Sequence, residues 1–144
     1  MAPCGHPRPA SEQRTSVERQ RYSTDTEWEG RVGYSRAIRV GPHVHVAGTL
    51  GVGPDGRPPE GAYAQSVAAL ERIRGALEAV GATVADVVRT RMYVVDVERN
   101  QFDVGRAHHE WFDNVRPAST MLGVAGFVDA AYLVEIEVEA IVSA

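Results

Sequence analysis

The chain has 144 residues and a net charge of −4 at pH 7, and its 15 basic residues are all arginines. These arginines form no cluster along the sequence, which argues against a nucleic-acid partner because phosphate binding needs concentrated positive charge. A hydrophobic content of 44% is enough for one globular domain with a core. No run of 18 apolar residues occurs, so no membrane partner is expected.

Residues 1–17 are rich in Pro, Ser, Arg and Gln and show no hydrophobic period. We expect a disordered extension there, followed by a single domain over residues 18–144. The extension contains Cys4, the one cysteine of the chain, and has no apolar stretch of the kind found in secretory signals. Because the chain cannot form an internal disulfide, we expect a cytoplasmic protein.

The first part of the domain predicts strands. The stretch RYSTDTEWE, residues 21–29, is compatible with a short edge strand. Residues 33–40 and 43–50 alternate in hydrophobicity and are separated by Gly-Pro, so we expect two strands joined by a tight turn. The Gly- and Pro-rich residues 51–61 can only form a loop.

From residue 62 the hydrophobic period changes from two to about three and a half, which predicts a helix. Gly81 is well placed to end this helix. Residues 87–95 are β-branched and alternating, so a strand follows. The apolar residues expected on the buried face of the helix are Val67, Leu70, Ile73, Leu77 and Val80.

A second helix is expected over residues 101–113, because Asn114 and Pro117 would end it. Two further strands are expected over residues 118–127 and 132–144. The residues expected on the buried face of this second helix are Phe102, Gly105, His109 and Phe112.

This order of elements predicts an α+β fold, a mixed sheet with two helices on one face. The other face would hold Glu135, Glu137 and Glu139 of the alternating stretch VEIEVEAIV, together with Tyr93 and an arginine, Arg89 or Arg91. A sheet face without helices either contacts water or packs against copies of the same chain.

Short catalytic motifs give little information. The chain has no P-loop, no HExxH, no GxSxG and no CxxC motif. His43 and His45 lie two apart on a predicted strand, and His108 and His109 are adjacent on a predicted helix, but a zinc site needs a further ligand. We therefore expect no metal and no cofactor. Taken alone, Glu135 is a surface carboxylate more often than a catalytic one.

Three longer segments resemble one family. The stretches GYSRAIRVGPHVHVAGTLG, ALEAVGATVADVVRTRMYVVDV and RPASTMLGVAGFVDAAYLVEIEVEAI resemble the Rid family (RidA/YjgF, the reactive-intermediate deaminases) in the same order, from about Arg21 to the C-terminus. The resemblance implies a chorismate-mutase-like fold. It also implies a homotrimer with three pockets at the subunit interfaces, which would cover the helix-free face.

Deaminating members of the family hydrolyse small imines and enamines, such as 2-aminoacrylate, to a keto acid and ammonia. In the resemblance, Glu135 matches the glutamate that positions or activates water, and Tyr34 matches a tyrosine that lines the pocket. The arginine that binds the substrate carboxylate has no match, because Ser119 stands at its position. Arg91, which precedes Tyr93 on one strand, is the better substitute, although a solvent-exposed strand arginine is an equal alternative.

We therefore expect a small-molecule enzyme acting on an imine, enamine or related carbonyl compound, with Glu135 as acid or base. Tyr34, Ser119 and Thr120 would donate hydrogen bonds to the substrate. The alternative is a non-catalytic small-molecule binder or sensor that uses the same pocket. Ribonuclease activity, a third possibility raised by the resemblance, fits an acidic chain poorly.

Overall fold

The computed structural model describes residues 16–144, so the predicted extension at residues 1–17 lies almost entirely outside the described part. One six-stranded sheet runs through it in the order β1-β2-β3-β6-β4-β5. All neighbouring strands are antiparallel except β4 and β5, so the sheet is mixed, as expected. The strands are β1 Arg19–Tyr22, β2 Ala37–Val40, β3 His43–Leu50, β4 Val87–Val95, β5 Ala118–Val124 and β6 Val134–Ile141.

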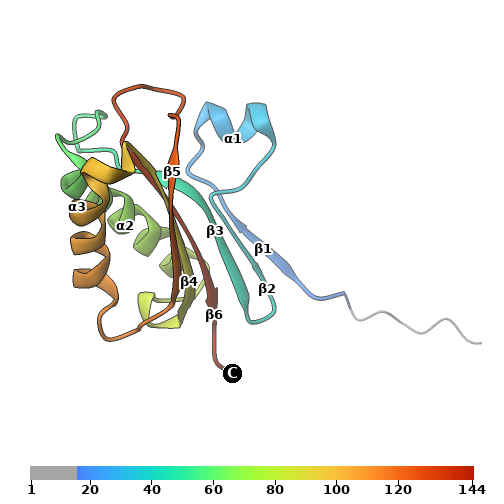
Figure 1. The fold of residues 1–144 in the computed structure, drawn as a ribbon. Helices are drawn as coiled ribbons and strands as arrows, with labels where there is room; N and C mark the ends of the chain where they lie inside the picture. Colours follow the sequence, from blue (N-terminus) through green and yellow to red (C-terminus); the bar gives the residue numbers. More distant parts are fainter. Residues whose placement is uncertain (1–15) are drawn as a thin grey trace, which may run out of the picture.

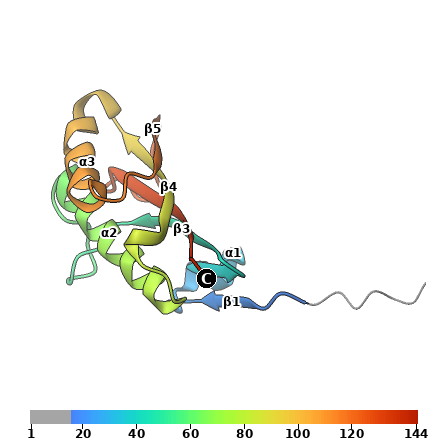
Figure 2. The ribbon, with the colours of Figure 1, turned by 90° about the horizontal axis from the view of Figure 1, so that it is seen from below.

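Two long helices cover one face of this sheet, which confirms the predicted α+β fold. They are α2, Ala62–Ala79, and α3, Val97–Phe112, and both lie on the same side of the strands (Figures 1 and 2). A short helix, α1, Glu27–Val32, lies away from them and close to β1 and β2. Among residues 16–144, no helix combines the length and the apolar character needed to cross a bilayer.

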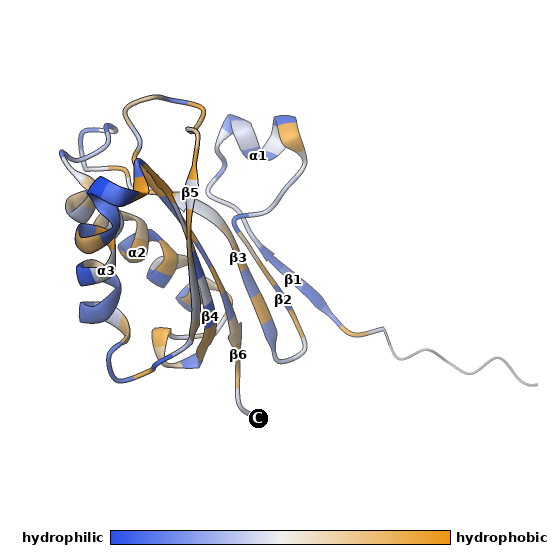
Figure 3. Ribbon diagram, in the orientation of Figure 1, coloured by the Kyte–Doolittle hydropathy of each residue, from blue (hydrophilic) through white to orange (hydrophobic). Residues whose placement is uncertain are grey.

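The core lies between the sheet and these two helices. Val134, Ile136 and Val138 of β6 are fully buried and face α2, where Leu70 and Leu77 are buried as well. Each side chain of this size contributes about 1.5–3 kcal/mol when it is removed from water. The side of α3 that faces away from the sheet is largely hydrophilic (Figure 3), as is typical of an amphipathic helix.

The predicted edge strand at residues 21–29 is wrong for most of its length. Strand β1 ends at Tyr22, and α1 begins at Glu27. The hydroxyl groups of Thr24 and Thr26 donate to the Glu29 carboxylate at 2.7 and 2.9 Å, and the Thr26 N–H donates to it at 3.4 Å. The bond from the Thr26 N–H belongs to a capping box, and local hydrogen bonds of this kind start a helix in competition with extended backbone.

The second helix begins earlier and faces differently than predicted. It starts at Val97, and Phe102, expected to be buried, is 81% exposed. Val104, Ala107 and Phe112 are the apolar residues that α3 buries. The Asn100 side chain donates to the Val95 carbonyl at 2.7 Å, which ties the first turn to the end of β4 and sets the rotation of the helix.

Candidate functional site

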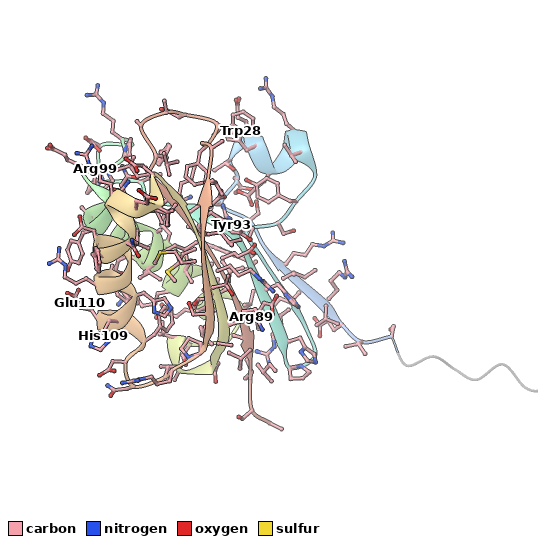
Figure 4. The ribbon with its side chains drawn as sticks, in the orientation of Figure 1. Trp28, Arg89, Tyr93, Arg99, His109 and Glu110 are labelled. Carbon is pink, nitrogen blue, oxygen red and sulfur yellow. The ribbon has the colours of Figure 1, made fainter. Side chains whose placement is uncertain are left out.

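The helix-free side of the sheet, here called the open face, carries a row of charged side chains. It contains Glu135, Glu137 and Glu139 of β6 and, on β4, Arg89, Arg91 and Tyr93. The register places Tyr93 opposite Glu135, Arg91 opposite Glu137 and Arg89 opposite Glu139. Tyr93 and Arg89 project away from α2 and α3 (Figure 4). The glutamates therefore lie opposite the helices, because their apolar neighbours along β6 fill the core.

Arg91 is already engaged on this face. Its Nη1 lies 3.0 Å from the Glu139 carboxylate and 3.5 Å from that of Glu137. Tyr93 donates its hydroxyl to Glu137 at 2.5 Å. The hydrogen bond to Glu139 raises the pKa of Arg91, and the one to Glu137 raises the pKa of Tyr93, since each bond needs the protonated form of its donor. The charge of Arg91 is thus shared between two carboxylates.

Next to this network the open face has a hollow of about 220 Å³. A hollow of this volume accommodates a small molecule of a few heavy atoms or a protein side chain, and it is smaller than most ligand pockets. It is lined by Ser35, Ile38, His45, Val46, Ala47, Arg91, Glu137, Val138 and Glu139.

Glu135 lies two residues before Glu137 on β6, in a different environment. Its side chain is half-buried, and burial raises the pKa of its carboxyl group, because water that would solvate the charge is excluded. The positive charge of Arg36 opposes this rise, and the charge of Glu137 adds to it. A raised pKa makes a carboxyl group better suited to take up a proton and return it.

The Glu135 carboxylate lies directly over Gly48 of β3. A methyl group at Gly48 would overlap Oε1 of Glu135 and would stand 2.9 Å from its Cδ. The pairing of β3 with β6 is irregular between Val46 and Thr49, so Gly48 belongs to a bulge. The bulge and the missing side chain together make room for the carboxylate.

Arg36, which our interpretation of the sequence did not select, lies beside Glu135. Its side chain is only 7% exposed, and Nη2 donates to the Gly48 carbonyl at 2.5 Å. Nε is buried without a hydrogen-bond partner in the described part of the chain. Burial lowers the pKa of the guanidinium, which stays charged at neutral pH. The sequence offered one indication of its importance: Arg36 lies two residues after Tyr34, which is the spacing of residues on one face of a strand.

Tyr34 follows α1 and is partly exposed. The guanidinium carbon of Arg36 lies 5.8 Å from the centre of its ring, within the range of a cation–π contact. Tyr34 therefore lies close to Arg36, which in turn lies near Glu135.

Ser119 and Thr120 lie on opposite sides of the sheet. Thr120 pairs with Arg91 in the β4–β5 register, on the open face. Ser119 pairs with Thr90, and the buried Thr90 hydroxyl donates to the Ser119 hydroxyl at 2.8 Å. Thr90 also lies 2.8 Å from Nε2 of His108 in the helix layer. Within one chain, Ser119 is thus separated from Glu135 by the sheet.

Fold and sequence both place the chain in a known family. The family model described as endoribonuclease L-PSP matches residues 24–142, and the chain belongs to this family, the YjgF/RidA family. A YjgF-family protein of Mycobacterium tuberculosis, whose crystal structure is solved, superposes with a TM-score of 0.80 and is 46% identical. That superposition covers 87% of this chain and all of that protein. The family resemblance inferred from the sequence is confirmed.

Two further relatives are similar in sequence. An uncharacterized protein of Streptomyces coelicolor is 39% identical over 127 residues, which cover 88% of this chain and 94% of the relative. A RutC family protein of Pyrococcus abyssi is 33% identical over 95 residues, 64% of this chain and 73% of that protein. Family membership supports a function connected with small molecules in general.

Proposed function

We propose that the protein is a small-molecule enzyme that hydrolyses an imine, an enamine or a related reactive carbonyl intermediate, with Glu135 as the acid and base. The observation that carries this proposal is the environment of Glu135. Its carboxylate is half-buried over Gly48, its pKa is raised by burial, and a buried arginine lies close by. Surface glutamates rarely combine these features.

In the proposed reaction, Glu135 takes a proton from water as the water oxygen attacks the carbon of the C=N bond. From a protonated imine this gives a neutral carbinolamine; its nitrogen receives a proton from Glu135, the C–N bond breaks to release ammonia, and the remaining hydroxyl proton passes to Glu135 or to water, which leaves the carbonyl compound. Glu135 returns the proton in the second half, so one carboxyl group serves both steps. Tyr34, Tyr93 and Thr120 would donate hydrogen bonds to the substrate.

We further propose that the working site lies between subunits of a homotrimer. Ser119 and Glu135 face opposite sides of one sheet, so both can contact one substrate only if different subunits supply them. Packing of the open face against a second copy would also remove Glu135 further from water. Stronger desolvation would raise its pKa more and strengthen its role as an acid.

The surroundings of Arg91 and the serine at position 119 limit which substrates the site could bind. Arg91 shares its charge with Glu137 and Glu139, so a substrate carboxylate would have to displace one of them. A serine hydroxyl at position 119 does not replace a bidentate guanidinium contact. We therefore favour a neutral imine or enamine, or a larger substrate bound through other groups.

The test is release of ammonia or of the carbonyl product from a panel of imines generated from neutral, aromatic and acidic amino acids. We expect turnover on neutral members and its loss in Glu135→Gln. Glu139→Gln is the matched control, because Glu139 lies on the same strand and face but pairs with Arg91. Full turnover in Glu135→Gln would refute the proposed role of Glu135.

The second candidate is a non-catalytic binder or sensor. The ion pairs of Arg91 with Glu137 and Glu139 favour it, because Arg91 is then not free to bind the carboxylate of a substrate. This candidate predicts saturable binding of a panel member without product. Calorimetric titration of the same panel separates the two functions. RNA cleavage fits less well, since three glutamates line the open face and repel phosphate.

A further inference from the structure

Arg36 has the features of a residue that contributes to a site by positioning another side chain. Buried arginines normally pair with a carboxylate or use all their donors. Among the described residues, the Arg36 side chain instead makes one hydrogen bond to a main-chain carbonyl, that of Gly48, and buries Nε without a partner. The carbonyl it binds belongs to the residue over which the Glu135 carboxylate lies.

We propose that Arg36 is a positioning residue for Glu135: its guanidinium fixes the bulge at Gly48, over which the Glu135 carboxylate lies, and supplies positive charge near that carboxylate. This inference rests on the proposed function of Glu135 as the acid and base, and it names a second residue that this function needs. Burial alone would favour a neutral carboxyl group, which cannot accept a proton from water. The charge of Arg36 opposes part of this effect of burial and so favours the ionised form of Glu135.

The charges around the pair are limited in number. Among the described residues, Arg36 is the cation that acts on Glu135, and Glu137, two residues further along β6, is the anion; Tyr93 of β4 pairs with Glu135 in the sheet. Glu29, Tyr34 and Arg72 act on Arg36 itself. Arg91 contacts Glu137 and Glu139 and is not among the groups that act on Glu135, which makes it a matched control.

Three consequences follow from the geometry. Removing the charge of Arg36 leaves burial unopposed and shifts the titration of Glu135 to higher pH. Keeping a charge there with lysine restores most of the effect. Adding a methyl group at Gly48 displaces the carboxylate without touching the arginine, because the methyl group and Oε1 cannot occupy the same place.

The experiment is a titration of the Glu135 carboxyl carbon by NMR in protein labelled with ¹³C-glutamate, with the signal assigned by its absence in Glu135→Gln. The variants are Arg36→Gln, Arg36→Lys and Arg91→Gln. Arg36→Met, which fills the same buried volume without a polar group, replaces Arg36→Gln if the latter does not fold. We expect an upward shift of the midpoint in the neutral Arg36 variants and little change in the other two.

An unchanged midpoint in Arg36→Gln or Arg36→Met, or an equal shift in Arg91→Gln, would overturn the proposal. Loss of the fold in both neutral variants would also overturn it, by assigning Arg36 to stability alone. The titration needs no substrate, so it stands apart from the proposed reaction. If Glu135→Gln kept full turnover while Arg36→Gln shifted the titration midpoint, the proposed reaction would be refuted, and the effect of Arg36 on Glu135 would be supported.

The same variants have a kinetic readout once a substrate is found. A general base must be ionised, so turnover falls at pH values below its pKa. Arg36→Gln should therefore move the acidic limb of the pH–rate profile upward, and Arg36→Lys should move it back. Gly48→Ala should lower kcat more than it raises KM, since it displaces the base and leaves the hollow on the open face unchanged.

Discussion

Glu29 offers the sharpest test of electrostatics in this fold, because it fixes the start of α1 and hence the segment that leads to Tyr34. Burial alone would raise its pKa, but hydrogen bonds from Thr24, Thr26 and Ser23 outweigh burial and hold the pKa at about 2, below its ordinary value of 4.5. The folded pKa is lower than the unfolded one. The ionised carboxylate therefore stabilises the fold above about pH 4.5, and this contribution is lost as the pH falls from about 4.5 to about 2.

The magnitude follows from the size of the shift. At about 1.4 kcal/mol per pH unit, the full difference would be about 3 kcal/mol. Glu29 itself is nearly buried, but its donors Thr24 and Thr26 lie at the surface, where solvent screens the interaction. We therefore expect Glu29→Gln to lower the free energy of unfolding by about 1–2 kcal/mol at pH 7.

The assay is urea unfolding of the wild type and Glu29→Gln at one protein concentration, at pH 7 and again at pH 3. The control is Glu27→Gln on the same helix, whose carboxylate forms an exposed pair with Arg31 at 3.5 Å and should cost less than about 0.5 kcal/mol. The difference between wild type and Glu29→Gln should shrink at the lower pH. An equal difference at both pH values would refute the argument from ionisation.

Three more predictions concern packing and the helix layer. Gly51→Ala should destabilise the fold by more than about 1 kcal/mol, because the new methyl group would overlap the main-chain carbonyl of Gln65. In contrast, Gly75→Ala in the exposed side of α2 has open space and should stabilise the fold by about 0.5–1 kcal/mol; urea unfolding measures both. Burial and the charge of His109 lower the pKa of His108, so its ring protons should titrate below pH 6.5 in NMR spectra. A midpoint at or above 6.5 would contradict the buried contact between His108 and Thr90.

Much of the fold follows from local pattern in the sequence. The alternation in VEIEVEAIV predicts a strand with apolar residues on one face and glutamates on the other, and β6 has both features. The change of period at residue 62 predicts α2, and Gly81 follows that helix with a positive φ of 77°, a backbone angle that glycine adopts at little cost. These elements are predictable because burial of one face imposes a period on each of them.

Other elements depended on local hydrogen bonds, which the hydrophobic pattern of the sequence does not reveal. Helix α1 has too few apolar residues to show a period, and the sign of its start was the Thr26–Glu29 pair. The rotation of α3 was set by Asn100 and the end of β4. A helix with Phe102 and His109 inside has a similar period, so the sequence pattern alone did not distinguish the two faces.

The sequence by itself identified the family, the sheet with helices on one face, and Glu135 as the carboxylate to test. Only the tertiary structure decided which arginine lies beside it. Arg36 and Glu135 are 99 residues apart, and both lie against Gly48 because β3 runs between β2 and β6 and bulges there. Likewise, the parallel register of β4 and β5 turns Ser119 toward Thr90 and away from the open face. Both outcomes depend on which residues of neighbouring strands pair and on where a bulge falls, because a shift of one residue moves each side chain to the other face of the sheet.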